Sequence, residues 1–363
     1  MSHAKTIVLP YASDFHTHLR QGDMMRAVTP LVKAGGVGTA LVMPNLTPPI
    51  VTGEQAMEYK ARLEELAPGV QFIMTLYMNP KLTPEEIHKS AKLGVTGVKV
   101  YPSGVTTNSD WGILEFEAYY PVFTAMQEEN MVLCLHGECP SDATKNICIM
   151  NAEEKFLATL RKLHNDFPKL RIVLEHATTK AAVECVKELG DTVGCTITAH
   201  HLSIIVDDWA GQPHNFCKPV AKYPDDREAL RQVIKEGHPR FFLGSDSAPH
   251  YRSAKQGEKP AAGVFTAPIL IPLLATLFEK IGCLDYLENF ISNNGRKFYQ
   301  LPIYNDLSKL DDSQKITLVK CNDNEEFVIP QVYSVESDSV DVSDGGRQIV
   351  PFMAGQKLSW KLQ

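Results

Sequence analysis

The chain has 363 residues, of which 44% are hydrophobic and 22% are charged, the composition of an ordinary globular protein with a sizeable core. Its 36 basic and 43 acidic residues give a formal net charge of −7 and form no basic cluster, which argues against a nucleic-acid-binding surface. No segment approaches the roughly 18 consecutive apolar residues of a membrane span, and the first ten residues lack the apolar stretch of a secretory signal. The eight cysteines include no CxxC pair. We therefore expect a cytoplasmic protein with reduced thiols.

Eight short segments rich in hydrophobic and β-branched residues predict strands. They are residues 12–18, 38–44, 70–77, 97–102, 131–137, 171–177, 193–201 and 240–246. Segments with helical apolar spacing lie between them, such as GEQAMEYKARLEELA at 53–67. An open doubly wound sheet would usually have fewer strands and a glycine-rich phosphate loop. The alternation therefore predicts an α/β fold, a (β/α)8 TIM barrel, over residues 1–304.

The composition changes after residue 304. The segment SVESDSVDVSDGG at 334–346 is rich in serine and aspartate, and QIVPFMAGQKLSWKLQ follows it. We expect residues 305–363 to form a C-terminal extension of short strands and loops packed on the barrel.

Polar side chains stand at the ends of the predicted strands, where barrel enzymes build their active sites. These residues are His16, His18, Lys99, His136, His176 and Asp246. A single histidine at a strand end is more often a hydrogen-bonded core residue than a ligand. Four histidines and an aspartate at the strand ends of one barrel instead predict a site for zinc or a similar divalent metal.

Lys99 lies between valines in the fourth predicted strand, so burial should lower its pKa and make the amine reactive. Three interpretations compete: a paired structural lysine, a Schiff-base lysine of an aldolase-like barrel, and a lysine carbamylated by carbon dioxide that bridges two metal ions. The surrounding histidines and aspartate favour the third.

Seven motifs resemble the amidohydrolase superfamily, and within it the dihydroorotases of the single-function type. They follow one another in the order expected for that family. The motifs are DFHTHLRQGDMM (14–25), VMPNLTPP (42–49), VKVYPSGVTTNS (98–109), LHGE (135–138), LEHATTK (174–180), GSDSAPH (244–250) and AAGVF (261–265).

This resemblance implies a zinc-dependent, reversible cyclisation of N-carbamoyl-L-aspartate to L-dihydroorotate in pyrimidine (UMP) synthesis. A hydroxide that bridges two Zn²⁺ ions would attack the ring amide, and Asp246 would act as general acid/base. The resemblance also suggests a homodimer. The first zinc would be bound by His16, His18, Asp246 and N6-carboxylysine at Lys99, and the second by Lys99, His136 and His176.

The resemblance also implies residues that bind the substrate. Arg20 offers a guanidinium to the substrate carboxylate, with further contacts from Asn45 and His250. Thr106 and Thr107 lie in a polar loop after the Lys99 strand and would close over the ligand. Ala262 and Lys218 match positions that contact the ring through the backbone, although Lys218 departs from the apolar residue of bacterial members.

Three other functions fit parts of the pattern. A hydantoinase or dihydropyrimidinase uses the same two-metal chemistry, but its neutral ring has no use for Arg20, Asn45 and His250. A Schiff-base lyase would use Lys99 as a free amine. A catalytically silent barrel would not need the full set of metal ligands.

Overall fold

The computed structural model describes residues 5–105, 112, 115–304, 306–322, 326–336 and 347–363. Eight parallel strands form one sheet in sequential order, and a bridge between Thr17 and Ser247 brings its two edges together. The strands are β2 (Ala12–Thr17), β3 (Val37–Val42), β4 (Gln71–Tyr77), β5 (Gly97–Val100), β6 (Val132–His136), β7 (Arg171–Glu175), β8 (Val193–Ile197) and β9 (Phe241–Leu243). The predicted (β/α)8 barrel is confirmed.

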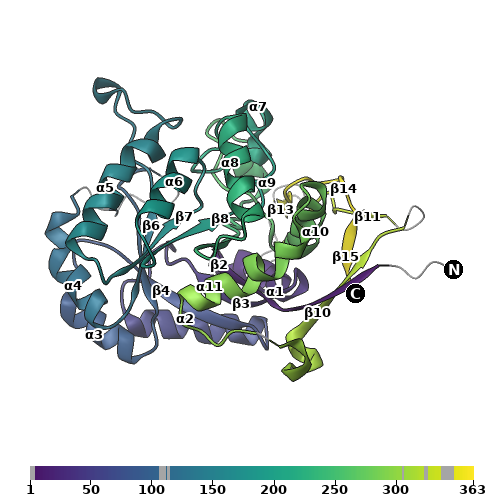
Figure 1. The fold of residues 1–363 in the computed structure, drawn as a ribbon, viewed down its shortest axis with the longest axis horizontal. Helices are drawn as coiled ribbons and strands as arrows, with labels where there is room; N and C mark the ends of the chain where they lie inside the picture. The colour runs from purple at the N-terminus through teal and green to yellow at the C-terminus, as the bar shows by residue number, and fades with distance from the viewer. Residues whose placement is uncertain (1–4, 106–111, 113–114, 305, 323–325, 337–346) are drawn as a thin grey trace.

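Helices surround this sheet (Figure 1). Threonines placed before several helices accept hydrogen bonds from their first turns, as Thr52 does from the main-chain N–H of Gln55. The helices are α1 (Gly22–Ala34), α2 (Gly53–Leu66), α3 (Pro84–Lys92), α4 (Tyr120–Glu128), α5 (Ala152–Asp166), α6 (Lys180–Glu188), α7 (Val206–Trp209), α8 (Pro224–Lys235), α9 (Arg252–Lys255), α10 (Leu270–Lys280) and α11 (Asn294–Phe298). In the part of the chain that the structure describes, no helix is both long and apolar enough to cross a membrane.

The first strand of the chain lies outside the barrel. β1 (Thr6–Pro10) pairs antiparallel with β10 (Lys315–Lys320), which pairs with β15 (Trp360–Leu362), at one side of the barrel (Figure 1). Two short antiparallel strand pairs also lie in this region: β11 (Phe327–Val328) with β14 (Lys357–Leu358), and β12 (Tyr333–Ser334) with β13 (Gln348–Ile349). The division of the chain at residue 305 stays a prediction.

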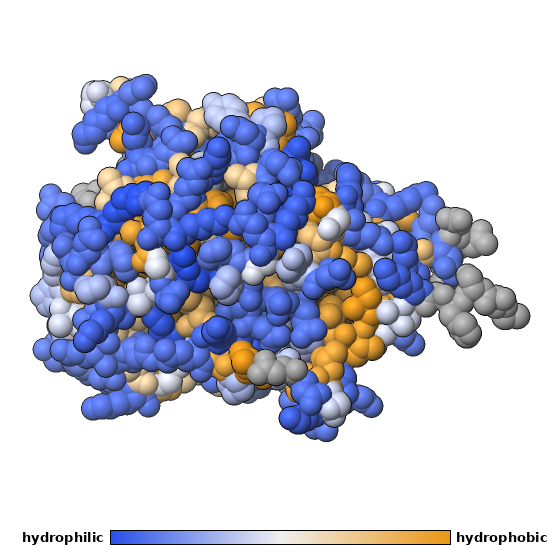
Figure 2. Space-filling model, in the orientation of Figure 1, coloured by the Kyte–Doolittle hydropathy of each residue, from blue (hydrophilic) through white to orange (hydrophobic). Residues whose placement is uncertain are grey.

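The small sheet buries one face against the barrel. Ile316 and Leu318 of β10 are buried and alternate with partly exposed residues, as expected for a half-covered strand. The face shown in Figure 2 is mostly hydrophilic, and a band of hydrophobic residues crosses it where β1 and β10 lie in Figure 1. Val8 of β1 is 45% exposed.

Seven of the eight barrel strands end one to four residues earlier than predicted, and for β7 and β9 this affects a residue of the site. β7 stops one residue before His176 and β9 stops three residues before Asp246. Both residues have positive φ angles, 44° and 45°, a left-handed conformation that non-glycine residues rarely adopt and that costs about 1–3 kcal/mol. Such strain persists where the surrounding structure enforces it, which is typical of functional sites.

Candidate functional site

One small cavity lies at the C-terminal ends of the barrel strands. It is lined by His16, His18, Arg20, Asn45, Tyr101, His136, His176, Lys218, Asp246, Ala248, Ala262 and Gly263. Two further predicted residues adjoin this lining: Lys99 lies beside Tyr101, and His250 contacts Arg20. The structure therefore brings together every predicted site residue except Thr106 and Thr107, which lie outside the described residues.

His16, His18 and Asp246 form a compact group whose ligating atoms all lie within 4.8 Å of one another. Nε2 of His16 and Nε2 of His18 lie 3.4 and 3.1 Å from the same oxygen, Oδ1 of Asp246. Burial lowers the pKa of both imidazoles, so they are neutral and retain lone pairs. Burial acts to raise the pKa of Asp246, but its contact with His18 and the charges around it outweigh this effect and lower the pKa to about 2.

Each of these histidines is oriented through its other ring nitrogen. Nδ1 of His18 lies 2.8 Å from Oδ1 of Asn45, and Nδ1 of His16 lies 2.8 Å from Oε2 of Glu175. Thr196 donates a second hydrogen bond to the same Glu175 oxygen. Both imidazoles therefore direct Nε2 towards Asp246, as in metal sites where a second set of residues fixes the ligands.

Glu175 was not predicted from the sequence. A continuous strand through residues 171–177 would direct the Glu175 and His176 side chains to opposite faces. Because β7 ends at Glu175 and His176 adopts a positive φ, both side chains reach the site. The sequence signal that could have indicated this role is the acidic residue directly before His176 in the motif LEHA.

The second predicted group, His136 and His176, packs ring against ring with centroids 4.9 Å apart. Nε2 of His136 lies 2.8 Å from Oε2 of Glu138, a contact that the sequence did not predict. Nδ1 of His176 is buried and has no hydrogen-bond partner among the described residues. His16 connects the two groups, because its ring centroid lies 4.8 Å from that of His176.

Lys99 is fully buried in β5, and its Nζ has no hydrogen-bond partner within the described residues. The centroid of the Tyr101 ring lies 5.2 Å from Nζ. Burial lowers the pKa of the Lys99 ammonium, although Glu175 and Asp246 act in the opposite direction. An unpaired ammonium at this position would be costly, so burial favours the neutral, nucleophilic form of the amine.

Arg20 contributes a guanidinium to the cavity wall. It adopts a φ of 60°, its Nε donates to the carbonyl oxygen of Pro249 at 3.0 Å, and its Nη2 lies 3.2 Å from Nε2 of His250. The same His250 nitrogen lies 2.9 Å from the carbonyl oxygen of Ala262. No carboxylate is among these partners, which leaves the positive charge of Arg20 available to an anion.

Lys218 lines the cavity, but its Nζ donates to the carbonyl oxygen of Val105 at 2.6 Å. A second lysine, Lys255, was not predicted from the sequence to belong to the site. Its buried Nζ donates to the carbonyl oxygens of Phe216, Ala261 and Gly263 at 2.7–2.8 Å. Lys255 thereby connects the two segments that carry Lys218 and Ala262, whose main chains were predicted to contact the substrate.

Comparison with known proteins agrees with this geometry. The model of the "Amidohydrolase family" matches residues 7–304. A dihydroorotase of Mycosarcoma maydis is 54% identical, and one of Saccharomyces cerevisiae is 46% identical, each alignment covering 98% of this chain and 98% of the relative. The crystal structure of a Saccharomyces cerevisiae dihydroorotase in complex with 5-fluoroorotic acid superposes with a TM-score of 0.90 at 45% identity, covering 99% of this chain and 98% of the other.

The agreement in sequence and structure thus extends over nearly the whole chain, including the barrel and the region after it. The chain belongs to the amidohydrolase family and, within it, to the dihydroorotases, hydrolases that act on cyclic amide bonds.

Proposed function

We propose that this dihydroorotase interconverts N-carbamoyl-L-aspartate and L-dihydroorotate in pyrimidine synthesis by means of two zinc ions and a carboxylated Lys99. The observation that carries the proposal is the fully buried amine of Lys99, which has no hydrogen-bond partner among the described residues and lies near enough to His16, His18, His176 and Asp246 to affect their pKa values. A neutral amine adds to the carbon of carbon dioxide and loses a proton, which replaces an unsatisfied nitrogen with a carboxylate that two cations can share.

The residues around Lys99 have the donor chemistry that zinc requires. Imidazole nitrogens and carboxylate oxygens are its usual ligands in catalytic sites, and burial keeps the imidazoles of His16, His18 and His176 neutral. When bound, the two ions would polarise the ring carbonyl and lower the pKa of water. The proposed ligands are His16, His18, Lys99 and Asp246 for one ion, and Lys99, His136 and His176 for the other.

Asp246 is the proposed general acid/base. In the hydrolytic direction its carboxylate accepts a proton from the attacking water and delivers it to the departing ring nitrogen. Oδ1 of Asp246 lies 3.1 Å from Nε2 of His18, and the low pKa of the carboxyl favours the ionised form that binds a cation and accepts a proton. The reverse sequence of proton transfers closes the ring.

Arg20 is proposed to bind the substrate carboxylate. Its guanidinium contacts the carbonyl oxygen of Pro249 and the ring of His250, neither of which is an anion, and Ala262 adjoins His250. The Saccharomyces cerevisiae relative was crystallised with 5-fluoroorotic acid, a carboxylic acid on a pyrimidine ring. Thr106 and Thr107 remain proposed contacts of the lid, Lys218 and Ala262 remain proposed main-chain contacts, and a homodimer and a cytoplasmic location stay predictions.

Replacing Arg20 with methionine should raise KM for dihydroorotate by about 10- to 150-fold, because a charge-assisted hydrogen bond contributes about 1.5–3 kcal/mol. Hydrolysis of a neutral ring such as hydantoin, if detectable, should not weaken. Steady-state kinetics with both substrates measure this. Arg26→Met is the control, since Arg26 pairs with Asp23 on exposed α1. Equal losses for both substrates would favour a hydantoinase-like site instead.

Replacing Glu175 with glutamine should lower zinc affinity by about 10- to 100-fold, as for other residues that orient a ligating histidine. The neutral amide accepts a weaker hydrogen bond from Nδ1 of His16. Zinc retained after dialysis against graded chelator measures the effect. Glu279→Gln, a change near the C-terminal strands where Glu279 contacts Ser359, should leave zinc retention as in the wild type. Unchanged retention in Glu175→Gln would contradict the orienting role.

The lyase alternative makes a separate chemical prediction. A Schiff base between Lys99 and a carbonyl substrate would be trapped by borohydride, whereas the proposed carbamate would not. We expect no borohydride-dependent inactivation in the presence of substrate. Covalent labelling of Lys99 under these conditions, detected by mass spectrometry, would favour the lyase.

A further inference from the structure

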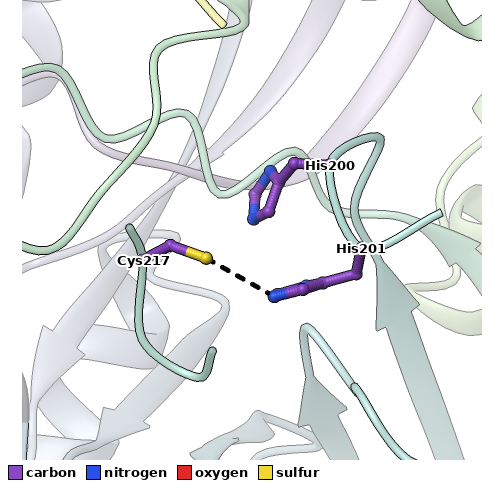
Figure 3. A group of neighbouring side chains, drawn as sticks. All are labelled: His200, His201 and Cys217. Carbon is purple, nitrogen blue, oxygen red and sulfur yellow. Dashed lines mark hydrogen bonds between the residues drawn. The ribbon is translucent and has the colours of Figure 1, made fainter. Parts of the chain in front are cut away.

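A second group of buried metal-ligating side chains lies beside the catalytic cavity. His200 and His201 follow β8, and Cys217 comes from the segment before Lys218 (Figure 3). One ligating atom from each lies within 4.8 Å of the others, and each residue is at most 1% exposed. None of the three belongs to the proposed catalytic zinc centre.

The hydrogen-bonding capacity of the His200 ring is unsatisfied among the described residues. The side chain is fully buried, and neither of its ring nitrogens has a hydrogen-bond partner among the described residues. An unpaired buried polar group costs about 1–3 kcal/mol. One of the nitrogens points towards the space between Cys217 and His201 (Figure 3).

The spacing of the other two donors fits a tetrahedral ion. Sγ of Cys217 and Nε2 of His201 lie 3.6 Å apart. Ligand bonds of about 2.3 Å from sulfur and 2.0–2.1 Å from nitrogen, at a tetrahedral angle, separate the two atoms by about 3.6 Å. One thiolate and two imidazoles are also donors that zinc prefers over harder cations. We propose that His200, His201 and Cys217 bind one Zn²⁺ ion, separate from the two of the catalytic centre.

Two hydrogen bonds to the carbonyl oxygen of Pro219 must be replaced by bonds to the metal when the ion binds. Nε2 of His201 and Sγ of Cys217 both donate to the carbonyl oxygen of Pro219, at 2.9 and 3.3 Å. The thiol proton leaves to solvent as the zinc–sulfur bond forms. The imidazole proton moves from Nε2 to Nδ1, where the hydroxyl oxygen of Thr198 lies 3.0 Å away and accepts it in a hydrogen bond. Thr198 thus supports the tautomer that binds metal, and one proton is released per ion.

The position of this site gives it a structural role. Cys217 lies between Phe216, whose carbonyl oxygen accepts from Lys255, and Lys218, which lines the catalytic cavity. An ion here would fix the chain after β8 to the segment that forms one wall of the cavity. We expect its removal to loosen that wall without removing the catalytic metals.

Cobalt distinguishes the proposed Cys217 site from the catalytic centre. A thiolate bound to Co²⁺ gives a charge-transfer band in the near ultraviolet. None of the ligands proposed for the catalytic centre is a cysteine. Metal-free full-length protein is titrated with Co²⁺ alone. We expect a thiolate band and a third bound equivalent in the wild type. Both should be lost in Cys217→Ser and in His200→Asn, with folding checked by thermal melting.

Cys134→Ser is the matched control, because Cys134 is a buried cysteine inside the barrel beside Tyr299. This variant should keep the band. Absence of the band in the wild type, or a band that persists in Cys217→Ser, would overturn the proposal and leave His200 to be satisfied by buried water. The dihydroorotate assay with zinc is a separate readout, so a failure of the proposed catalytic mechanism would be recognised independently.

Discussion

Replacing Lys99 with alanine is expected to lower kcat for dihydroorotate by at least about a thousandfold and to reduce bound zinc. The carboxylated side chain is proposed to be a ligand of both ions, and the ions contribute several kcal/mol of charge stabilisation, with about 1.4 kcal/mol for each factor of ten. The amine of Lys99 is fully buried and has no partner among the described residues that would give it another function. Turnover in both directions, together with metal analysis, measures the loss.

Two further variants separate the carboxylate from the charge of lysine. Lys99→Arg keeps a cation but does not form the carbamate, so we expect it to be as inactive as Lys99→Ala. Lys320→Met is the control for a lysine outside the site, because Lys320 pairs with Glu279 beside the C-terminal strands, and it should leave kcat and bound zinc as in the wild type. In Lys99→Ala, a small added carboxylic acid should restore part of the activity by occupying the space left by the side chain. A Lys99→Arg enzyme with full activity and two zinc ions would contradict the mechanism.

Replacing Asp246 with asparagine should lower kcat by about 10²- to 10⁴-fold, the usual contribution of a positioned general acid/base. The amide still offers an oxygen to His18 and to a metal ion, but it accepts no proton from water. Activity is measured at saturating zinc, and bound metal is measured on the same samples, so that loss of the proton acceptor is distinguished from loss of the ion.

Asp226→Asn is the control for a buried aspartate. Its carboxylate accepts from the main-chain N–H groups of Lys180 at the start of α6 and of Tyr223 just before α8, so the change should lower stability while leaving kcat unchanged. If Asp246→Asn retained wild-type kcat with its metals bound, another group would have to transfer the proton.

The sequence was sufficient to predict the eight barrel strands because each carries a compact hydrophobic run followed by a polar residue. It also placed His16, His18 and Lys99 at one end of the barrel, since parallel strands of a barrel present their C-terminal ends on one side. The antiparallel pairing of β1 with β10 was not predicted, because a strand partner some 300 residues away leaves no local signal in either segment.

The residues that orient the site were harder to predict. Glu175 reaches His16 only because the strand stops there and His176 adopts a left-handed conformation, and period-two alternation assumes that the strand continues. The contact between His136 and Glu138 and the three carbonyl groups around Lys255 depend on loop conformations. Loop geometry of this kind depends on tertiary packing, and neither periodicity nor composition encodes it.

The chemical state of Lys99 is the most direct test of the proposed two-zinc mechanism. A crystal structure of the protein prepared with zinc and bicarbonate should show continuous electron density for a carboxylate on Nζ of Lys99, with one anomalous zinc peak on each side of it. Density that ends at Nζ, with an unmodified amine and no ion within bonding distance, would contradict the account.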